Sequence, residues 1–354
     1  MVTYSSIKLG TAGTVICPIA TDRRYNRRAI ASRSVEGLKG PAAGSSTRLF
    51  YTTKPGFHQR SRLAPAADAI TQRMSSNGHR ITHVSDTARW TALHRATESA
   101  RPDALFSDPL AERLAGEHGR AIVANAPRAQ RSGWWLVART RLIDDAIAEA
   151  IAAGCDRVLN LAAGLDTRPY RLDLPPNLIW IEADLPPLLA EKSELLADQT
   201  PRCRLTRTAV DLIDPVARGA FLDEALDGAS KALVLTEGLL MYLEDRDVVG
   251  LSEAIKRPEV AWWMVNFTGP QLKKTMNSRI AGMRQNAPFK FAPENGVAFF
   301  EELGWRTLEV QSLLAAAHRF RRLPILRRPA AWLPQPDPRH PGGRPFAAVA
   351  LLTH

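Results

Sequence analysis

A turn of small residues and a carboxylate twenty positions later form the most informative pattern in this chain. Val158–Leu161 is apolar and runs into Ala162-Ala163-Gly164, where small side chains let a ligand approach the backbone closely. Asp184 stands 20 residues after Gly164, at the end of the next apolar segment. A carboxylate at this spacing can receive ribose hydroxyls in a nucleotide-binding β-α-β unit. The pattern therefore predicts a nucleoside site, with a plain strand, turn and helix as the alternative.

The type of nucleoside follows from which glycines are missing. A dinucleotide fingerprint would place glycine at positions 162, 164 and 167, but the chain has Ala162, Gly164 and Thr167. The missing glycines would serve a pyrophosphate and close helix packing. S-adenosylmethionine carries ribose and adenine without phosphate and tolerates the change. The turn favours that cofactor over a nicotinamide dinucleotide, so an oxidoreductase is the weaker alternative.

Strands and helices must alternate around this turn to position it. The apolar runs predict strands at Arg157–Leu161, Leu178–Ala183, Arg204–Val210, Ala232–Thr236, Ala261–Phe267, Trp305–Val310 and Phe346–Leu352. Helical patterns predict helices at Asp86–Thr97, Asp108–Glu117, Trp134–Ala153, Pro187–Ala197 and Asp245–Lys256. Such alternation implies right-handed crossovers, and therefore an α/β fold whose mostly parallel seven-stranded sheet has helices on both faces. We expect Asp86 with Thr87 and Asp108-Pro109 to begin the first two helices, and the terminal strand to close a sheet edge.

The positive charge of the chain is concentrated at one end. Residues 1–73 hold 12 Lys/Arg and 3 Asp/Glu, whereas the remaining residues hold 35 and 33. Residues 1–79 are expected to be a basic, disordered extension, because they offer too little apolar surface to offset their ordering entropy. Three interpretations stay open for it: a transit peptide, a binding tail, or an over-long reading of the start with Met74 as the true first residue. Residues 80–354 form the predicted catalytic domain.

Other function classes find little support in the composition. Three scattered cysteines argue against a disulfide framework and for a reducing, cytoplasmic location. No apolar run is long enough to span a bilayer, and the nearly neutral globular part argues against a nucleic-acid partner. His79 and His83 have a spacing that could seat a metal, but no third ligand stands nearby, so no metal is expected.

Five separated motifs resemble the leucine carboxyl methyltransferase family, in particular its bacterial branch of S-adenosylmethionine-dependent methyltransferases. They are Asp86–Arg89, Arg101–Pro109, Asn160–Arg168, Trp180–Pro186 and Thr236–Leu243, in this order. The resemblance covers roughly residues 80–354. It implies a class I methyltransferase fold, S-adenosyl-L-methionine as the cofactor, and O-methylation of a small-molecule carboxylate or hydroxyl.

The resemblance also implies roles for individual residues. Arg139 would pair with the methionine carboxylate, and Asp184 would accept both ribose hydroxyls. Asp211 would accept from the adenine amine while the Leu212 N–H donates to a ring nitrogen. Glu237 would face the methionine amine or the sulfonium, where a negative charge favours a cationic cofactor. Each has an ordinary structural alternative: a surface arginine, a helix cap, a strand-end turn, and a carboxylate paired with an arginine.

Three further positions complete the expected site. Ala162 stands where the family often has a glycine against the methionine part, and Gly164 belongs to the same turn. Tyr242 could line the acceptor pocket. The preface Asp86–Glu117 and the insert Thr268–Pro293 would form a lid. A catalytically silent cofactor-binding protein remains an alternative, because cofactor motifs do not prove turnover.

Overall fold

The computed structural model describes residues 84–128, 130–280 and 288–354. The predicted extension 1–79, with Met74 and His79, lies outside these residues, and so does His83. Part of the predicted lid insert, residues 281–287, is outside them as well.

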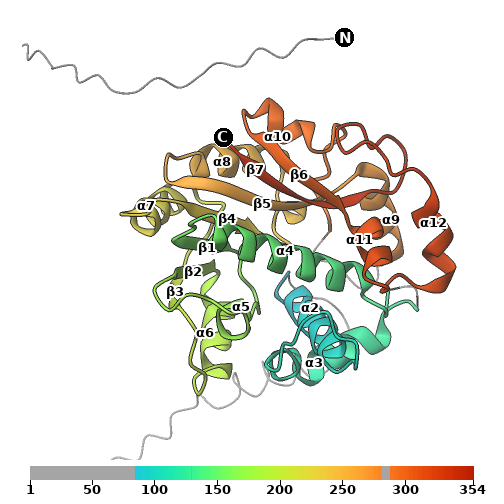
Figure 1. The fold of residues 1–354 in the computed structure, drawn as a ribbon, viewed down its shortest axis with the longest axis horizontal. Coiled ribbons are helices and arrows are strands. Elements are labelled where there is room, and N and C mark those ends of the chain that lie inside the picture. Colours follow the sequence, from blue (N-terminus) through green and yellow to red (C-terminus); the bar gives the residue numbers. More distant parts are fainter. Residues whose placement is uncertain (1–83, 129, 281–287) are drawn as a thin grey trace, which may run out of the picture. The chain divides into compact units, whose positions relative to one another are not determined.

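One seven-stranded sheet forms the centre of the described chain (Figure 1). Its strand order is β3-β2-β1-β4-β5-β7-β6, with parallel pairing from β3 through β5 and antiparallel pairing of β7 with β5 and β6. The strands are β1 Arg157–Leu161, β2 Ile179–Asp184, β3 Arg204–Ala209, β4 Ala232–Thr236, β5 Val260–Thr268, β6 Arg306–Ser312 and β7 Ala347–Thr353. The mostly parallel, helix-covered sheet predicted from the sequence is confirmed, and each predicted strand is found within about two residues of its expected bounds.

The expected place of the last strand in the sheet is wrong. β7 lies between β5 and β6, and β6 forms the edge. The physical reason is burial on both faces: β7 is buried at most positions, as its apolar sequence requires, whereas no position of β6 is buried. An exposed, polar strand is better suited to an edge than an apolar one.

Alternate strand residues divide the core into two layers. Val158, Trp180 and Leu233 face the layer that contains α4 (Trp134–Ala152) and α11 (Leu313–Arg319). Leu159, Ile181 and Val234 point the other way, and the layer on that side contains α7 (Pro215–Leu226), α8 (Asp245–Ile255) and α10 (Ala298–Glu302). Strand side chains alternate between the two faces, so one apolar strand fills both layers at once.

The first two helices begin differently from the prediction. α2 spans Val84–Ser99 and α3 spans Ala111–Asn125, with a kink at Gly116 where φ is 58°. Asp86 and Thr87 lie inside the first turns of α2 rather than capping it, and the Asp86 carboxylate lies 3.1 Å from His118 Nε2. Asp108 precedes α3 by three residues. Its buried carboxylate accepts a hydrogen bond from Arg95 and does not cap the helix.

The remaining helices connect and cover the strands. The long helix at residue 134 and those near 187 and 245 were predicted, while the helix after β3 was not. Besides those already given, the structure has α5 Arg168–Arg171, α6 Pro186–Leu195, η1 Leu240–Tyr242, α9 Pro270–Ile280, η2 Ile325–Arg327 and α12 Arg328–Trp332. None of the described helices has the length and apolar character needed to cross a membrane.

Candidate active site

A cavity of about 290 Å³ lies where β1, β2 and β4 end. We call it the strand-end cavity; its wall also includes residues of α2 and α4. All eight residues singled out from the sequence line it: Arg139, Ala162, Gly164, Asp184, Asp211, Leu212, Glu237 and Tyr242. Open α/β sheets bind ligands at this edge, where the strand order reverses on either side of β1.

The turn after β1 brings the backbone to the cavity. Ala162 and Gly164 both have left-handed backbone, with φ of 54° and 52°. This conformation is ordinary for glycine and unfavourable for alanine. The Gly164 N–H donates to Asp184 Oδ2 at 2.7 Å. The turn is thus tied to the end of the neighbouring strand.

Asp184 is held by backbone on both sides. Its Oδ1 accepts from the Leu185 N–H at 2.7 Å, while Oδ2 accepts from Gly164. Burial raises the pKa of this carboxyl above its usual value, although the two N–H donors oppose the shift. Each oxygen keeps a further acceptor site, so the carboxylate can still receive two hydroxyls.

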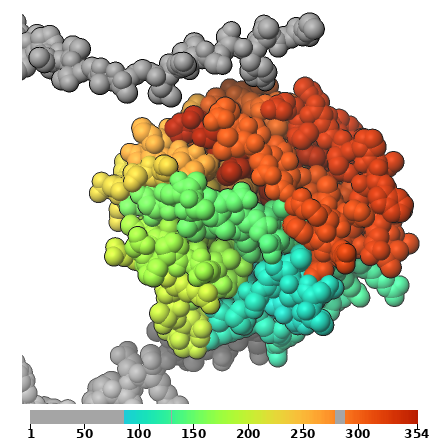
Figure 2. Space-filling model, viewed as in Figure 1, coloured from blue at the N-terminus to red at the C-terminus, as the bar shows by residue number. Residues whose placement is uncertain are grey.

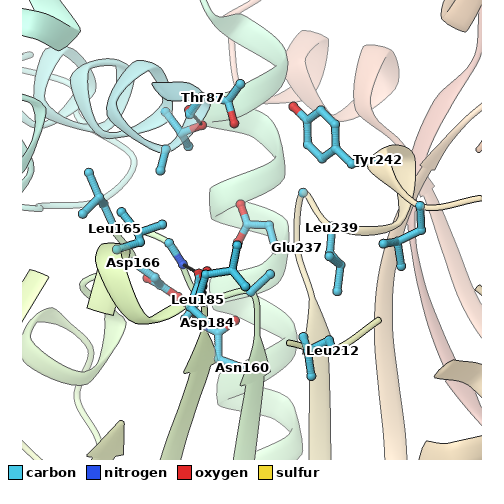
Figure 3. Close-up of a pocket in the computed structure, with 18 of the residues that line it drawn as sticks. Thr87, Asn160, Leu165, Asp166, Asp184, Leu185, Leu212, Glu237, Leu239 and Tyr242 are labelled. Atoms are coloured by element: carbon cyan, nitrogen blue, oxygen red, sulfur yellow. Dashed lines mark hydrogen bonds between the residues drawn. The ribbon is translucent and has the colours of Figure 1, made fainter. Parts of the chain in front are cut away.

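Glu237 connects two arginines at the centre of the cavity. Arg139 Nε donates to Glu237 Oε1 at 2.8 Å, and Arg168 Nη1 donates to Glu237 Oε2 at 2.7 Å. Arg168 also donates to Asp144 at 2.7 Å and to Asp166 at 2.8 Å. In Figure 3, Glu237 lies between Asp184 on one side and Tyr242 on the other. Pairing with arginine was one of the two readings that the sequence left open for this carboxylate.

The ion pairs keep the buried carboxyls charged. Burial alone would raise the pKa of Glu237, but Arg168 and Arg139 lower it below its usual value. The same balance, dominated by Arg168, holds the pKa of Asp166 well below its normal range. Both groups are therefore ionised at neutral pH and are weak bases.

Arg139 has donors to spare. It is buried, so it is not a surface arginine, and only its Nε bonds to Glu237. Its two η nitrogens make no hydrogen bond to any residue that the structure describes, and they stand beside Gly238, where an added Cβ would lie 3.8 Å from Nη1. A guanidinium with two free donors in a cavity can bind a carboxylate in a bidentate manner.

The far wall of the cavity comes from the segment after β3. Asp211 is exposed, and its Oδ1 accepts from the Ile213 N–H at 2.9 Å. Leu212 is buried, and its carbonyl accepts from Arg218 at 2.8 Å. Its N–H makes no hydrogen bond within the described part of the chain. This wall therefore offers a carboxylate oxygen, a free N–H donor and an apolar side chain to a flat ring.

Several residues of the site were missed in the sequence. Asp166 and Arg168 lie in the quoted motif, and Asn160 donates to Asp166 at 2.8 Å, yet none received a role. The signal was available, because polar residues that interrupt a buried strand and turn must find partners. Thr87 and Thr91 of α2 also line the cavity, and nothing in their local sequence distinguishes them from ordinary helix residues.

Metal and thiol chemistry find no support in the described residues. There, no three His, Cys, Asp or Glu side chains gather as a metal site would require. Cys155 and Cys203 are buried, and burial raises the pKa of each thiol to about 11. Such thiols are protonated at neutral pH and are poor nucleophiles.

Comparison with known proteins identifies the family. Residues 88–256 match the family described as "Leucine carboxyl methyltransferase". A relative from Frankia alni, called a "Putative S-adenosyl-L-methionine-dependent methyltransferase", is 31% identical over 62% of this chain and 82% of its own length. A relative of the same description from Parafrankia sp. is 35% identical over 49% of this chain, and the alignment spans only 59% of that protein.

Among solved structures, similarity is more distant. A "putative methyltransferase" from Thermobifida fusca is 15% identical, with a TM-score of 0.46 over 83% of this chain and 100% of that one. The assignment rests on the family match and the sequence relatives. The chain belongs to the leucine carboxyl methyltransferase family of S-adenosyl-L-methionine-dependent methyltransferases.

Proposed function

We propose that this chain transfers a methyl group from S-adenosyl-L-methionine to an oxygen of a small molecule, either a carboxylate or a hydroxyl. The observation that carries the proposal is that Asp184 and Arg139 line the same cavity. Asp184 presents a carboxylate fixed by two backbone N–H groups, and Arg139 presents two unused donors. A nucleoside with an amino-acid tail needs both groups.

The residues present fit this cofactor. Asp184 would accept the ribose hydroxyls, and the η nitrogens of Arg139 would bind the methionine carboxylate. Asp211 and the Leu212 N–H would hold the adenine edge. The turn at Ala162 and Gly164 lets a ligand approach the backbone closely, but it lacks two of the three glycines that serve a pyrophosphate.

Glu237 takes on two tasks in this proposal. Its negative charge lies where it would favour the methionine amine and the sulfonium. Its hydrogen bond to Arg139 Nε also fixes the direction of that guanidinium. Glu237 is therefore a positioning residue for Arg139 as well as a cofactor-binding candidate.

The cofactor, when bound, supplies a methyl group on a positively charged sulfur. The chain must hold the acceptor oxygen in line with that group and exclude water. A carboxylate acceptor arrives without a proton and needs no base, whereas a hydroxyl must lose one. Tyr242 lines the cavity near Glu237 and Thr87 and would contact the acceptor (Figure 3).

The wider setting follows from the same proposal. Residues 80–354 would form the methyltransferase domain, preceded by the basic extension 1–79, and the acceptor would be a small molecule rather than nucleic acid or membrane. Residues 86–117 and 268–293 would cover the site. The location would be cytoplasmic.

Calorimetry with S-adenosylmethionine and with NAD tests the cofactor. We expect micromolar binding of the former and none of the latter. Preference for NAD would overturn the proposal and favour an oxidoreductase. A mass-spectrometric screen for methyl transfer to small carboxylic acids and phenols tests turnover; cofactor binding without any methylated product would instead favour a silent cofactor-binding protein.

A further inference from the structure

A second cavity, of about 410 Å³, adjoins the strand-end cavity. Five residues line both cavities, which places the two side by side: Thr87, Thr91, Arg139, Gly238 and Tyr242. We call the second one the tryptophan cavity. Because Arg139 and Tyr242 belong to both walls, a molecule in the tryptophan cavity lies next to the strand-end cavity.

The lining of the tryptophan cavity is apolar and rich in rings. Three tryptophans contribute, and two of them, Trp134 and Trp135, meet edge to face at 5.7 Å. Tyr242 and Phe289 form a second edge-to-face pair at 5.6 Å. The other large apolar lining residues are Trp90, Leu136, Met241, Phe267, Leu272, Met276 and Leu313. Aromatic walls favour flat, ring-bearing ligands through offset and edge contacts.

The charges that line this cavity have one sign. Among its described lining residues there is no Asp, Glu, His or Lys, and the charged ones are Arg139 and Arg327. The Arg327 guanidinium lies 6.0 Å from the ring centre of Trp134 and forms no ion pair with any described residue. The Arg327 charge repels a cationic ligand and offers an anion a partner.

The elements that form this wall are distant in sequence and adjacent in space. They include α2, α4, η1, α9 and the segment from Leu313 to Ala347. Figure 2 shows residues of the α2–α3 region, in cyan, directly beside the orange and red C-terminal part of the chain. The cavity therefore exists only in the folded chain and is not encoded by any one motif.

We propose that the tryptophan cavity binds the methyl acceptor, and that this acceptor is an apolar, ring-bearing organic anion with an acidic oxygen. The inference rests on the proposed function and adds the class of substrate to it. In the transfer, an electron pair of the acceptor oxygen forms the new O–CH₃ bond. The C–S bond breaks, and its electron pair stays on sulfur, which becomes neutral.

The lowered pKa of Glu237 agrees with an ionised acceptor. Glu237 is the carboxylate beside the residues shared by the two cavities, and its pKa is lowered by Arg168 and Arg139, so it accepts a proton poorly. An oxygen that arrives already ionised releases no proton and needs no such base. Arg327 would then recognise the negative charge of the acceptor as it enters, or a second acidic group at the far end.

Calorimetry on the full chain, with and without S-adenosylhomocysteine, tests the inference with matched probes. The probes are 2-naphthoate, 2-naphthylmethylamine and acetate. We expect 2-naphthoate to bind roughly tenfold or more tightly than the amine of similar shape, and acetate not to bind measurably. Equal affinity for the anion and the cation would overturn the charge argument, and binding of acetate as tight as naphthoate would overturn the ring argument.

Variants locate the binding. Met276→Trp should fill the cavity and weaken naphthoate binding roughly tenfold or more, with S-adenosylhomocysteine binding unchanged. Arg327→Met should remove most of the preference for naphthoate over the amine without affecting the fold, because Arg327 is exposed. The matched controls are Trp332→Ala, an exposed tryptophan with 73% of its surface accessible, and Arg328→Met, both outside the cavity lining.

The outcomes separate this inference from the proposed function. If S-adenosylmethionine binds but neither Met276→Trp nor Arg327→Met changes naphthoate binding, the substrate class is wrong and the methyltransferase proposal stands. If the cofactor does not bind, the methyltransferase proposal fails, and the acceptor assignment, which rests on it, fails with it.

Discussion

The strand-end cavity and the tryptophan cavity share Arg139 and Tyr242 but are held in shape by different forces. In the first, carboxylates and arginines are fixed by hydrogen bonds of 2.7–2.8 Å to one another and to backbone. In the second, aromatic and aliphatic side chains from several elements form the wall by packing. The first is organised before any ligand arrives, so it suits a constant ligand. The second can change shape by substitution of single apolar residues, so it suits a ligand that varies between relatives.

The most severe way to break this contrast is to remove Arg168. Arg168→Met would leave Asp144, Asp166 and Glu237 without their shared buried cation. Breaking a buried pair in this way costs about 3–5 kcal/mol of unfolding free energy. Urea unfolding followed by circular dichroism measures the loss. The control is Arg113→Met, since Arg113 and its partner Asp198 are both exposed, and the variant is expected to lose only about 0.2–1 kcal/mol. Equal losses of unfolding free energy in the two variants would show that the buried network stabilises the fold no more than a surface ion pair does.

A second experiment asks whether Asp184 belongs to the cofactor side alone. Asp184→Ala should weaken S-adenosylmethionine binding roughly tenfold or more, about 1.4 kcal/mol, because the ribose loses its acceptor. Naphthoate binding in the neighbouring cavity should stay within experimental error. Asp173→Ala, at an exposed position outside both cavities, is the control. If the affinity for both ligands fell together, the two cavities would be one functional site.

The two cavities should also respond differently to pH. Burial raises the pKa of Asp184, so its carboxylate protonates at a higher pH than an ordinary aspartate. Cofactor affinity should therefore fall as the pH is lowered into the acidic range, and Asp184→Asn should flatten the profile. Glu237 has a lowered pKa and keeps its ion pairs throughout this range. Naphthoate binding should be nearly constant, since the charged lining residues of the tryptophan cavity are arginines. A flat cofactor profile in the unchanged protein would contradict the role of Asp184.

The smallest effect is expected from the N-terminal segment. A chain that begins at Met74 should fold with the same unfolding midpoint and bind the cofactor equally well, because it keeps every residue that lines the cavities in the described part of the chain. Thermal unfolding and calorimetry of the shortened chain check this. A truncated chain that fails to fold would show that the predicted extension is part of the domain.

The contrast between the cavities also explains what could be predicted from the sequence. The strand-end cavity is built from residues that end strands, and Asp184 and Gly164 are separated by a spacing that the fold itself sets. The strands of the sheet could be predicted equally well, because most of them are apolar runs between helices. The order of β6 and β7 in the sheet could not be predicted, because no spacing in the sequence says which of the two antiparallel strands pairs with β5. Only the greater burial of β7 distinguishes them.

The tryptophan cavity could not be predicted for a different reason. Trp134, Met276 and Arg327 are far apart in the chain, and each looks like an ordinary core or surface residue in its own element. Only the three-dimensional packing gives them a common purpose. The ion-pair network around Arg168 could be predicted in part. Its members stand out in the sequence as polar residues in apolar surroundings, but the sequence does not show which of them pair.

The left-handed backbone at Ala162 has a consequence for how this family can evolve. An alanine with φ of 54° carries roughly 1–2 kcal/mol of steric strain. A glycine at this position would remove the strain but raise the conformational entropy of the unfolded chain, which costs about 0.4–1 kcal/mol of stability. The strain is the larger of the two effects, so folding favours glycine at this position, by less than about 2 kcal/mol. Descendants can exchange alanine for glycine in a step that does not weaken the fold and that removes a methyl group from the wall of the strand-end cavity. Position 162 is thus a place where the lineage can explore a different cavity shape without first losing its fold.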